Sequence, residues 1–260
     1  MKIKGRYIVI IIILIVYFLL MYFWLGKDNL KKEKLSTKII IGNSSVWELY
    51  KKSWTNINNE SNLKRINWSE FKVINDDKKL GTYYVWYDSE EWYLFDKDKN
   101  AVNYEGRLLA YRANYDIKVD KFKVEEVTDY SDIAGFLKEK NIDINSELTV
   151  NSYVNFDIDN DGVDEVIYLF SNVFSMESNP EEVFSLVFAK KNDSIYILYD
   201  SVEENDGYNG CKPYINYILD IDDDNEKEII LSCGRYSDQK PIDMLFKFKN
   251  DSFNILVTNQ

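Results

Sequence analysis

The hydrophobic residues of this chain follow three patterns: one uninterrupted apolar run, many short alternating segments, and two aspartate-rich breaks between apolar segments. The apolar run, residues 7–25, holds 19 residues without a charge. As a helix rising about 1.5 Å per residue it would span roughly 28 Å, enough for the hydrocarbon core of a bilayer. We therefore expect residues 1–26 to form a cytoplasmic tail and a transmembrane signal-anchor.

A cleaved signal peptide and a buried helix of a soluble protein are the alternatives for this run. Signal-peptide cleavage needs small residues at the C-terminal end of the apolar run, where only Gly26 is small. A buried helix of a soluble protein is rarely so uniformly apolar. Basic residues flank both ends, so the positive-inside rule is nearly balanced. Residues 27–43, rich in lysine, are expected to be a juxtamembrane linker.

Alternating and aromatic segments predict a β-rich region over residues 44–150. Residues 82–87 and 92–95 predict a hairpin around a polar turn. Residues 108–113 and residues 117–127 predict two further strands.

Short helices are expected at two places in the same region. Ser45 and Glu48 have the spacing of a capping box and predict a helix that starts there. A second helix is expected over residues 133–140, capped by Asp129 or Ser131 and ended by Asn141. Residues 56–62 are a polar break between these elements.

Residues 151–260 contain an internal repeat, with units at 151–201 and 212–258. Each unit has the order strand, acidic loop, strand, long loop, strand, turn, strand. The acidic loops start at Asp157 and Asp220, and the turn that begins at Lys191 recurs at Lys249 after a slightly shorter interval. Four strands joined by tight turns make one antiparallel blade. The predicted fold is therefore mainly β: a transmembrane helix, then four-strand blade-like repeats in an incomplete propeller or a sandwich, with one or two short helices.

The acidic loops have the side-chain chemistry of a calcium site. The first carries aspartates at positions 1, 3 and 5, Gly162 at position 6 and glutamate at position 9. Ca²⁺ takes six to eight oxygen ligands, and glycine permits the sharp bend. An EF-hand needs glutamate at position 12, where this chain has Tyr168, so the loop is a shorter strand-loop-strand version. The second loop has Asn225 in place of glycine, and asparagine also tolerates a left-handed bend. The alternative for both loops is a solvated acidic turn.

Charge and composition exclude several classes of function. The formal net charge is −12, and removing the three basic residues before the apolar run leaves −15 for the rest. Such a body repels nucleic acid. The chain has no histidine, which excludes a Ser-His-Asp triad, a Cys-His pair and a His-ligated zinc site. Cys211 and Cys233 flank the second acidic loop and are either a disulfide or two buried thiols.

A repeated four-strand unit with an Asp-x-Asp-x-Asp-Gly-x-x-Glu loop resembles the FG-GAP/VCBS-type repeats of bacterial surface proteins and integrin α-chain propellers. The resemblance covers roughly two-fifths of the chain, and it implies Ca²⁺ bound in both loops. The ligands it implies are Asp157, Asp159, Asp161, the Val163 carbonyl and Glu165 in the first loop, and Asp220, Asp222, Asp224, the Glu226 carbonyl and Glu228 in the second.

These observations predict a membrane-anchored, extracellular interaction module with structural calcium and a protein or glycan partner. Sites of this type are weak, about 10⁻⁴ to 10⁻³ M in extracellular modules, and would stay empty at cytosolic calcium levels. Trp86, Trp92 and Tyr87 are candidate contact residues, although each is more often a core residue. The alternatives are a membrane-anchored hydrolase and a cell-envelope assembly partner. We do not expect an enzyme, because adjacent glutamates in a strand point to opposite faces.

Overall fold

The computed structural model describes residues 38–41, 45–50, 52–88, 91–113, 116–143, 148–173, 182–204, 210–234 and 241–259. The apolar run over residues 7–25 lies outside them. Among the described residues no helix is long and apolar enough to cross a membrane. This part of the chain is mainly antiparallel β-structure in three sheets, with the short helices α2 (Glu60–Ile66) and α3 (Ala134–Glu139). The mainly-β prediction is confirmed.

The first sheet has eight strands, all from the N-terminal half of the described chain. In spatial order they are β3 (Ser53–Asn56), β2 (Val46–Tyr50), β1 (Lys38–Ile41), β8 (Leu108–Arg112), β4 (Ser69–Asn75), β5 (Lys78–Asp88), β6 (Glu91–Phe95) and β7 (Ala101–Val102). Helix α2 covers one face, where Leu63 and Ile66 pack against Phe71 and Val85. The predicted hairpin is β5 and β6, and β8 matches the predicted strand over residues 108–113.

The other two sheets have five strands each and contain the repeat. One has the order β10 (Glu125–Glu126), β11 (Val150–Phe156), β12 (Glu165–Ser171), β13 (Glu182–Lys191), β14 (Ser194–Glu204). The other has the order β18 (Phe253–Thr258), β17 (Ile242–Phe248), β16 (Glu228–Gly234), β15 (Lys212–Asp220), β9 (Lys118–Val119). Each sheet is therefore a four-strand meander with one added edge strand.

The edge strands correct one prediction. Residues 117–127 were expected to form one strand, but they supply β9 to one sheet and β10 to the other. The chain crosses from one five-stranded sheet to the other between β9 and β10, so these residues cannot form one continuous strand.

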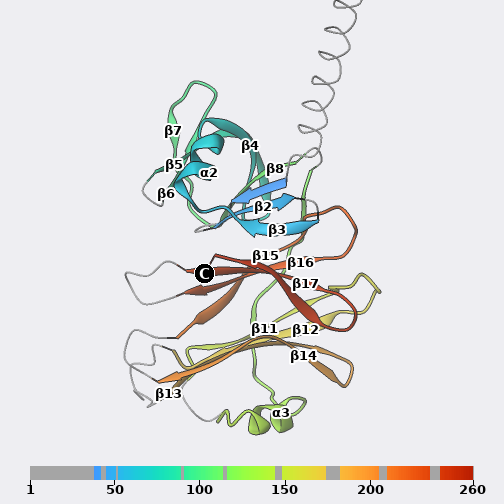
Figure 1. Ribbon diagram of the computed structural model, residues 1–260. Coiled ribbons are helices and arrows are strands. Elements are labelled where there is room, and N and C mark those ends of the chain that lie inside the picture. The colour runs from blue at the N-terminus through green and yellow to red at the C-terminus, as the bar shows by residue number, and fades with distance from the viewer. Residues whose placement is uncertain are drawn as a thin grey trace, which may run out of the picture.

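The three sheets and α3 are stacked in layers (Figure 1). Trp47 and Leu109 of the eight-stranded sheet share a core cluster with Tyr217 and Leu245 of the β15–β18 sheet. A second cluster joins the two five-stranded sheets. Leu137 of α3 packs with Phe188 on the far face of the β11–β14 sheet. The β15–β18 sheet is thus buried on both faces.

The helix expected at Ser45–Glu48 is wrong, because residues 46–50 form β2. The capping-box spacing is present, but Val46 and Trp47 are both fully buried and belong to cores on opposite faces of the sheet. Successive side chains alternate in this way only in a strand. Ser45 donates its hydroxyl to the carboxylate of Asp243, on a distant strand, instead of capping a helix.

The remaining local predictions have mixed outcomes. Helix α3 is where it was expected, and Asn141 just beyond it has a φ of +59°. The residue at its N-cap is Ile133, which makes no side-chain capping bond. Asp129, one of the expected caps, instead accepts a hydrogen bond from the Ser131 N–H. Helix α2 begins inside the expected polar break, where the Asn59 side chain caps it. Residues 38–41, expected in the linker, form β1.

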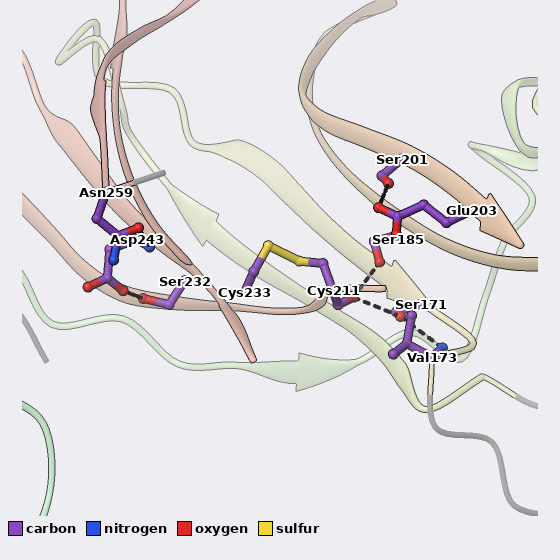
Figure 2. The surroundings of a disulfide bond; sticks show 10 residues. All are labelled: Ser171, Val173, Ser185, Ser201, Glu203, Cys211, Ser232, Cys233, Asp243 and Asn259. Carbon is purple, nitrogen blue, oxygen red and sulfur yellow. Dashed lines mark hydrogen bonds between the residues drawn. A yellow bond between two sulfur atoms is a disulfide. The ribbon is translucent and has the colours of Figure 1, made fainter. Parts of the chain in front are cut away.

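Cys211 and Cys233 form a disulfide, which decides between the two alternatives (Figure 2). Both cysteines are buried in the core between the two five-stranded sheets. The hydroxyls of Ser171 and Ser185, on strands of the opposite sheet, donate to the Cys211 carbonyl. The disulfide region therefore ties the second repeat to the first.

Candidate metal centres in the two acidic loops

The two acidic loops occupy equivalent places in the two repeat sheets. The first connects β11 to β12 and the second connects β15 to β16. Position 2 of each loop is a fully buried isoleucine, Ile158 or Ile221, and the two pack in different core clusters. The Lys227 N–H donates to the Ile158 carbonyl at 3.3 Å, so the loops contact each other. Hydrophobic anchors hold both loops at one edge of the layered body.

The backbone bends in the same way in both loops. Positions 4 and 6 have positive φ: Asn160 (+61°) and Gly162 (+88°) in the first loop, Asp223 (+63°) and Asn225 (+68°) in the second. Glycine, asparagine and aspartate are the residues that adopt this conformation most readily. Asn225 therefore replaces glycine without changing the path of the loop.

The first aspartate of each loop accepts hydrogen bonds from the turn that it encloses. Asp157 accepts from the N–H groups of Asp161 and Gly162, at 3.0 and 2.9 Å. Asp220 accepts from the equivalent N–H of Asp224 at 3.2 Å and of Asn225 at 3.2 Å. These bonds turn the remaining carboxylates toward one point.

The last residue of each loop is a buried glutamate. Glu165 is 2% exposed and Glu228 is 0% exposed. One oxygen of each accepts from the N–H at position 2, Ile158 at 2.8 Å or Ile221 at 2.7 Å. Burial raises the pKa of Glu165, and it raises the pKa of Glu228 to about 7.

Three carboxylates of each loop lie close together. Asp157, Asp159 and Glu165 place ligand atoms within 4.8 Å of one another, and so do Asp220, Asp222 and Glu228. Asp161 and Asp224 each contact a lysine ammonium that the aspartate at position 3 and the glutamate at position 9 of the same loop also contact. Six of the predicted side-chain ligands therefore converge directly, and the other two contact the same lysines.

The two predicted carbonyl ligands behave differently. Val163 is 53% exposed, and its N–H donates to Asp161. Glu226 donates its N–H to Asp224 in the same way, but its carboxylate also reaches the lysine of its loop at 3.4 Å. Ligation by either carbonyl stays a prediction.

Those lysines, Lys191 and Lys247, were not recognised as part of the site from the sequence. They lie on β13 and β17, far from the loops in sequence, so no local motif contains them. The cross-strand register identifies them. Glu228 pairs with Lys247, and Val166, next to Glu165, pairs with Lys190, next to Lys191.

Of the aromatic residues singled out in the sequence, two can be placed. Trp92 packs against the core under α2, which favours a core role for it over a contact role. Trp86 lies on the opposite face, where its ring is 5.3 Å from that of Trp68. The side chain of Tyr87 lies outside what the structure describes.

The residues present fit a hard divalent cation. Apart from one lysine ammonium, the side-chain atoms that converge in each pocket are carboxylate oxygens, the ligand type that Ca²⁺ prefers. Each pocket also contains a buried carboxylate that needs a positive partner, and in this structure a lysine ammonium is that partner. Comparison with protein-family models, with curated proteins and with solved structures gives no match for this chain.

Proposed function

We propose that this chain is a membrane-anchored extracellular calcium-binding β-repeat protein, an interaction module with structural Ca²⁺. One observation carries the proposal: two loops from separate repeat units fold alike and gather the same set of carboxylates. An acidic turn that is merely solvated has no reason to repeat its bends, its hydrogen bonds and its buried glutamate. The two repeat sheets are, in this proposal, blade-like units of the FG-GAP/VCBS type stacked as a sandwich.

The proposed ligands connect strands to one another. Glu165 and Glu228 begin β12 and β16, while Asp157 and Asp220 end or follow β11 and β15. A calcium ion bound to residues from both ends of a loop would neutralise the loop carboxylates. It would also fix where the two flanking strands end and begin. Because the loops also contact each other, both ions would support the same edge of the body.

Two features support an extracellular location. The Cys211–Cys233 disulfide belongs to oxidising compartments such as the bacterial exterior. Calcium loops with affinities of about 10⁻⁴ to 10⁻³ M are filled at extracellular calcium levels. The anchor in this proposal is residues 7–25.

An exposed aromatic patch is the proposed partner surface. It lies on the face of β4–β6 opposite α2 and consists of Trp68, Tyr84, Trp86, Tyr93 and Phe95. Trp68 is 43% exposed and Tyr93 is 41% exposed. The Trp68 ring also lies 4.8 Å from that of Phe95. Aromatic faces of this kind are enriched at protein interfaces, so a protein partner fits this patch, and a glycan is the alternative.

Calorimetric titration of the full chain in detergent micelles with Ca²⁺ tests the proposal. We expect binding with a dissociation constant of about 10⁻⁴ to 10⁻³ M. Asp159→Asn and Asp222→Asn should each weaken one site. Asp164→Asn and Asp223→Asn are matched controls, since both residues are exposed loop aspartates outside the clusters. Heat of binding that is absent, or that the controls reduce as much as the test variants do, would contradict the proposal.

A further inference from the structure

Each carboxylate pocket contains an ammonium group of the chain itself. Lys191 Nζ lies 2.5 Å from Asp159, 2.6 Å from Asp161 and 3.1 Å from Glu165. Lys247 Nζ lies 2.6 Å from Asp224, 2.8 Å from Glu228 and 3.2 Å from Asp222. The Lys191 side chain is 16% exposed and that of Lys247 only 7%. Both ammonium groups stand at the point where the carboxylates converge.

The two lysines are equivalent in the fold but not in the sequence repeat. The matched turn motifs align Lys191 with Lys249. In the structure the strand pair β13–β14 closes at Lys191 and Ser194, whereas β17–β18 closes at Phe248 and Phe253, which leaves a longer turn. The residue opposite the loop glutamate is therefore Lys247. The two repeats have lysine at one structural position although their turns differ in length, which points to a role for the ammonium.

Electrostatics explains what the ammonium does. Burial alone would lower the pKa of Lys247, but its bonds to Asp224 and Glu228 outweigh burial and raise the pKa. The lysine therefore stays charged and compensates the carboxylates around it. A metal ion at the convergence point would be in contact with the ammonium, and two cations cannot share that position. Lysine has a long flexible stem, so it can leave the pocket without a change in the backbone.

We infer that Lys191 and Lys247 are tethered cations that hold the two pockets when calcium is absent and that calcium must displace. This inference rests on the proposed calcium function and adds its regulation. The apparent affinity of a site is its intrinsic affinity multiplied by the fraction of molecules in which the site is open. A lysine that occupies the pocket in roughly 90 to 99% of molecules weakens calcium binding by roughly ten- to hundredfold. The loops thus keep their shape at low calcium and respond only to high calcium.

Calcium titration of Lys191→Met and Lys247→Met in the full chain tests the inference. Methionine retains much of the lysine stem and removes the charge. Each variant should tighten one site by roughly ten- to hundredfold, and its loss of stability in chelator should be restored by calcium. Lys249→Met is the matched control, because Lys249 is the sequence counterpart of Lys191 but is exposed in the turn.

The outcomes separate the inference from the proposed function. Calcium binding by the unmodified chain that is tighter in both lysine variants supports the inference. Calcium binding that is equal or weaker in the variants overturns the inference and leaves the proposed function standing. If neither the variants nor the unmodified chain bind calcium, both fail.

A second measurement needs no variant and covers the case in which the substitutions prevent folding. Reductive methylation followed by peptide mass spectrometry reports how accessible each lysine amine is. Calcium should speed the modification of Lys191 and Lys247, with Lys249 unchanged. Protection of the first two amines that is the same in calcium and in chelator, under conditions where calcium is bound, would overturn the inference.

Discussion

Reduction of the Cys211–Cys233 disulfide should destabilise the folded chain by an amount that follows from the length of the loop that the disulfide closes. The two cysteines are 22 residues apart. In the chain-entropy model a crosslink of this span removes about 11 cal/mol/K from the unfolded state, or roughly 3.4 kcal/mol at 25 °C. Because whole domains are stable by about 5–15 kcal/mol, this is a large share of the total.

The assay is urea unfolding of the full chain in micelles, followed by tryptophan fluorescence, with and without reductant. For an m-value of about 2–3 kcal/mol/M, the midpoint should fall by roughly 1.1 to 1.7 M on reduction. The double variant Cys211→Ala/Cys233→Ala is the control, since its midpoint should be low and should not respond to reductant. A wild-type midpoint that reductant leaves unchanged would refute the reasoning, because it would mean that the sulfurs are not bridged.

Three further predictions concern single residues. Burial raises the Glu228 pKa to about 7 from its ordinary value of 4.5, so the folded state keeps a proton that the unfolded state releases. Without calcium, its contribution to unfolding free energy should therefore fall by up to about 3 kcal/mol as pH rises from 4.5 to 7, and Glu228→Gln should remove this share of the pH dependence in urea titrations. Gly210→Ala should cost about 1–3 kcal/mol by the same assay, because Gly210 has a φ of +100° and a Cβ there would lie 2.6 Å from Val173; no loss would contradict the packing. Trp68→Ala should weaken partner capture at least tenfold without lowering the thermal unfolding midpoint. Unchanged capture would exclude the aromatic patch as the partner surface.

The sequence was sufficient for features that local patterns control. Runs of β-branched and aromatic residues bounded by turn residues located β5, β6 and the eight strands of the repeat. The acidic loops were recognisable because bends, carboxylates and flanking strands follow one another directly in the chain. Asn225 was correctly expected to bend like Gly162, since both adopt positive φ.

Tertiary contacts decided the rest. Ser45 and Glu48 satisfy the helix-capping pattern, yet pairing with β1 and β3 makes the segment a strand. Lys191 and Lys247 were missed because their partners lie on another strand, and only the pairing register brings them together. The matched turns even suggested the wrong counterpart, Lys249, because a longer turn shifts the sequence match away from the structural one.

The most direct test of the calcium account is the thermal unfolding midpoint of the full chain in millimolar Ca²⁺ and in chelator. A ligand at about ten times its dissociation constant stabilises by about 1.4 kcal/mol per site, so two sites give roughly 2.8 kcal/mol. At about 2–4 °C per kcal/mol the midpoint should rise by roughly 6 to 11 °C. Asp157→Ala and Asp220→Ala should each remove about half of the rise. Melting curves that overlay in calcium and chelator would contradict the account and leave the loops as lysine-neutralised acidic turns.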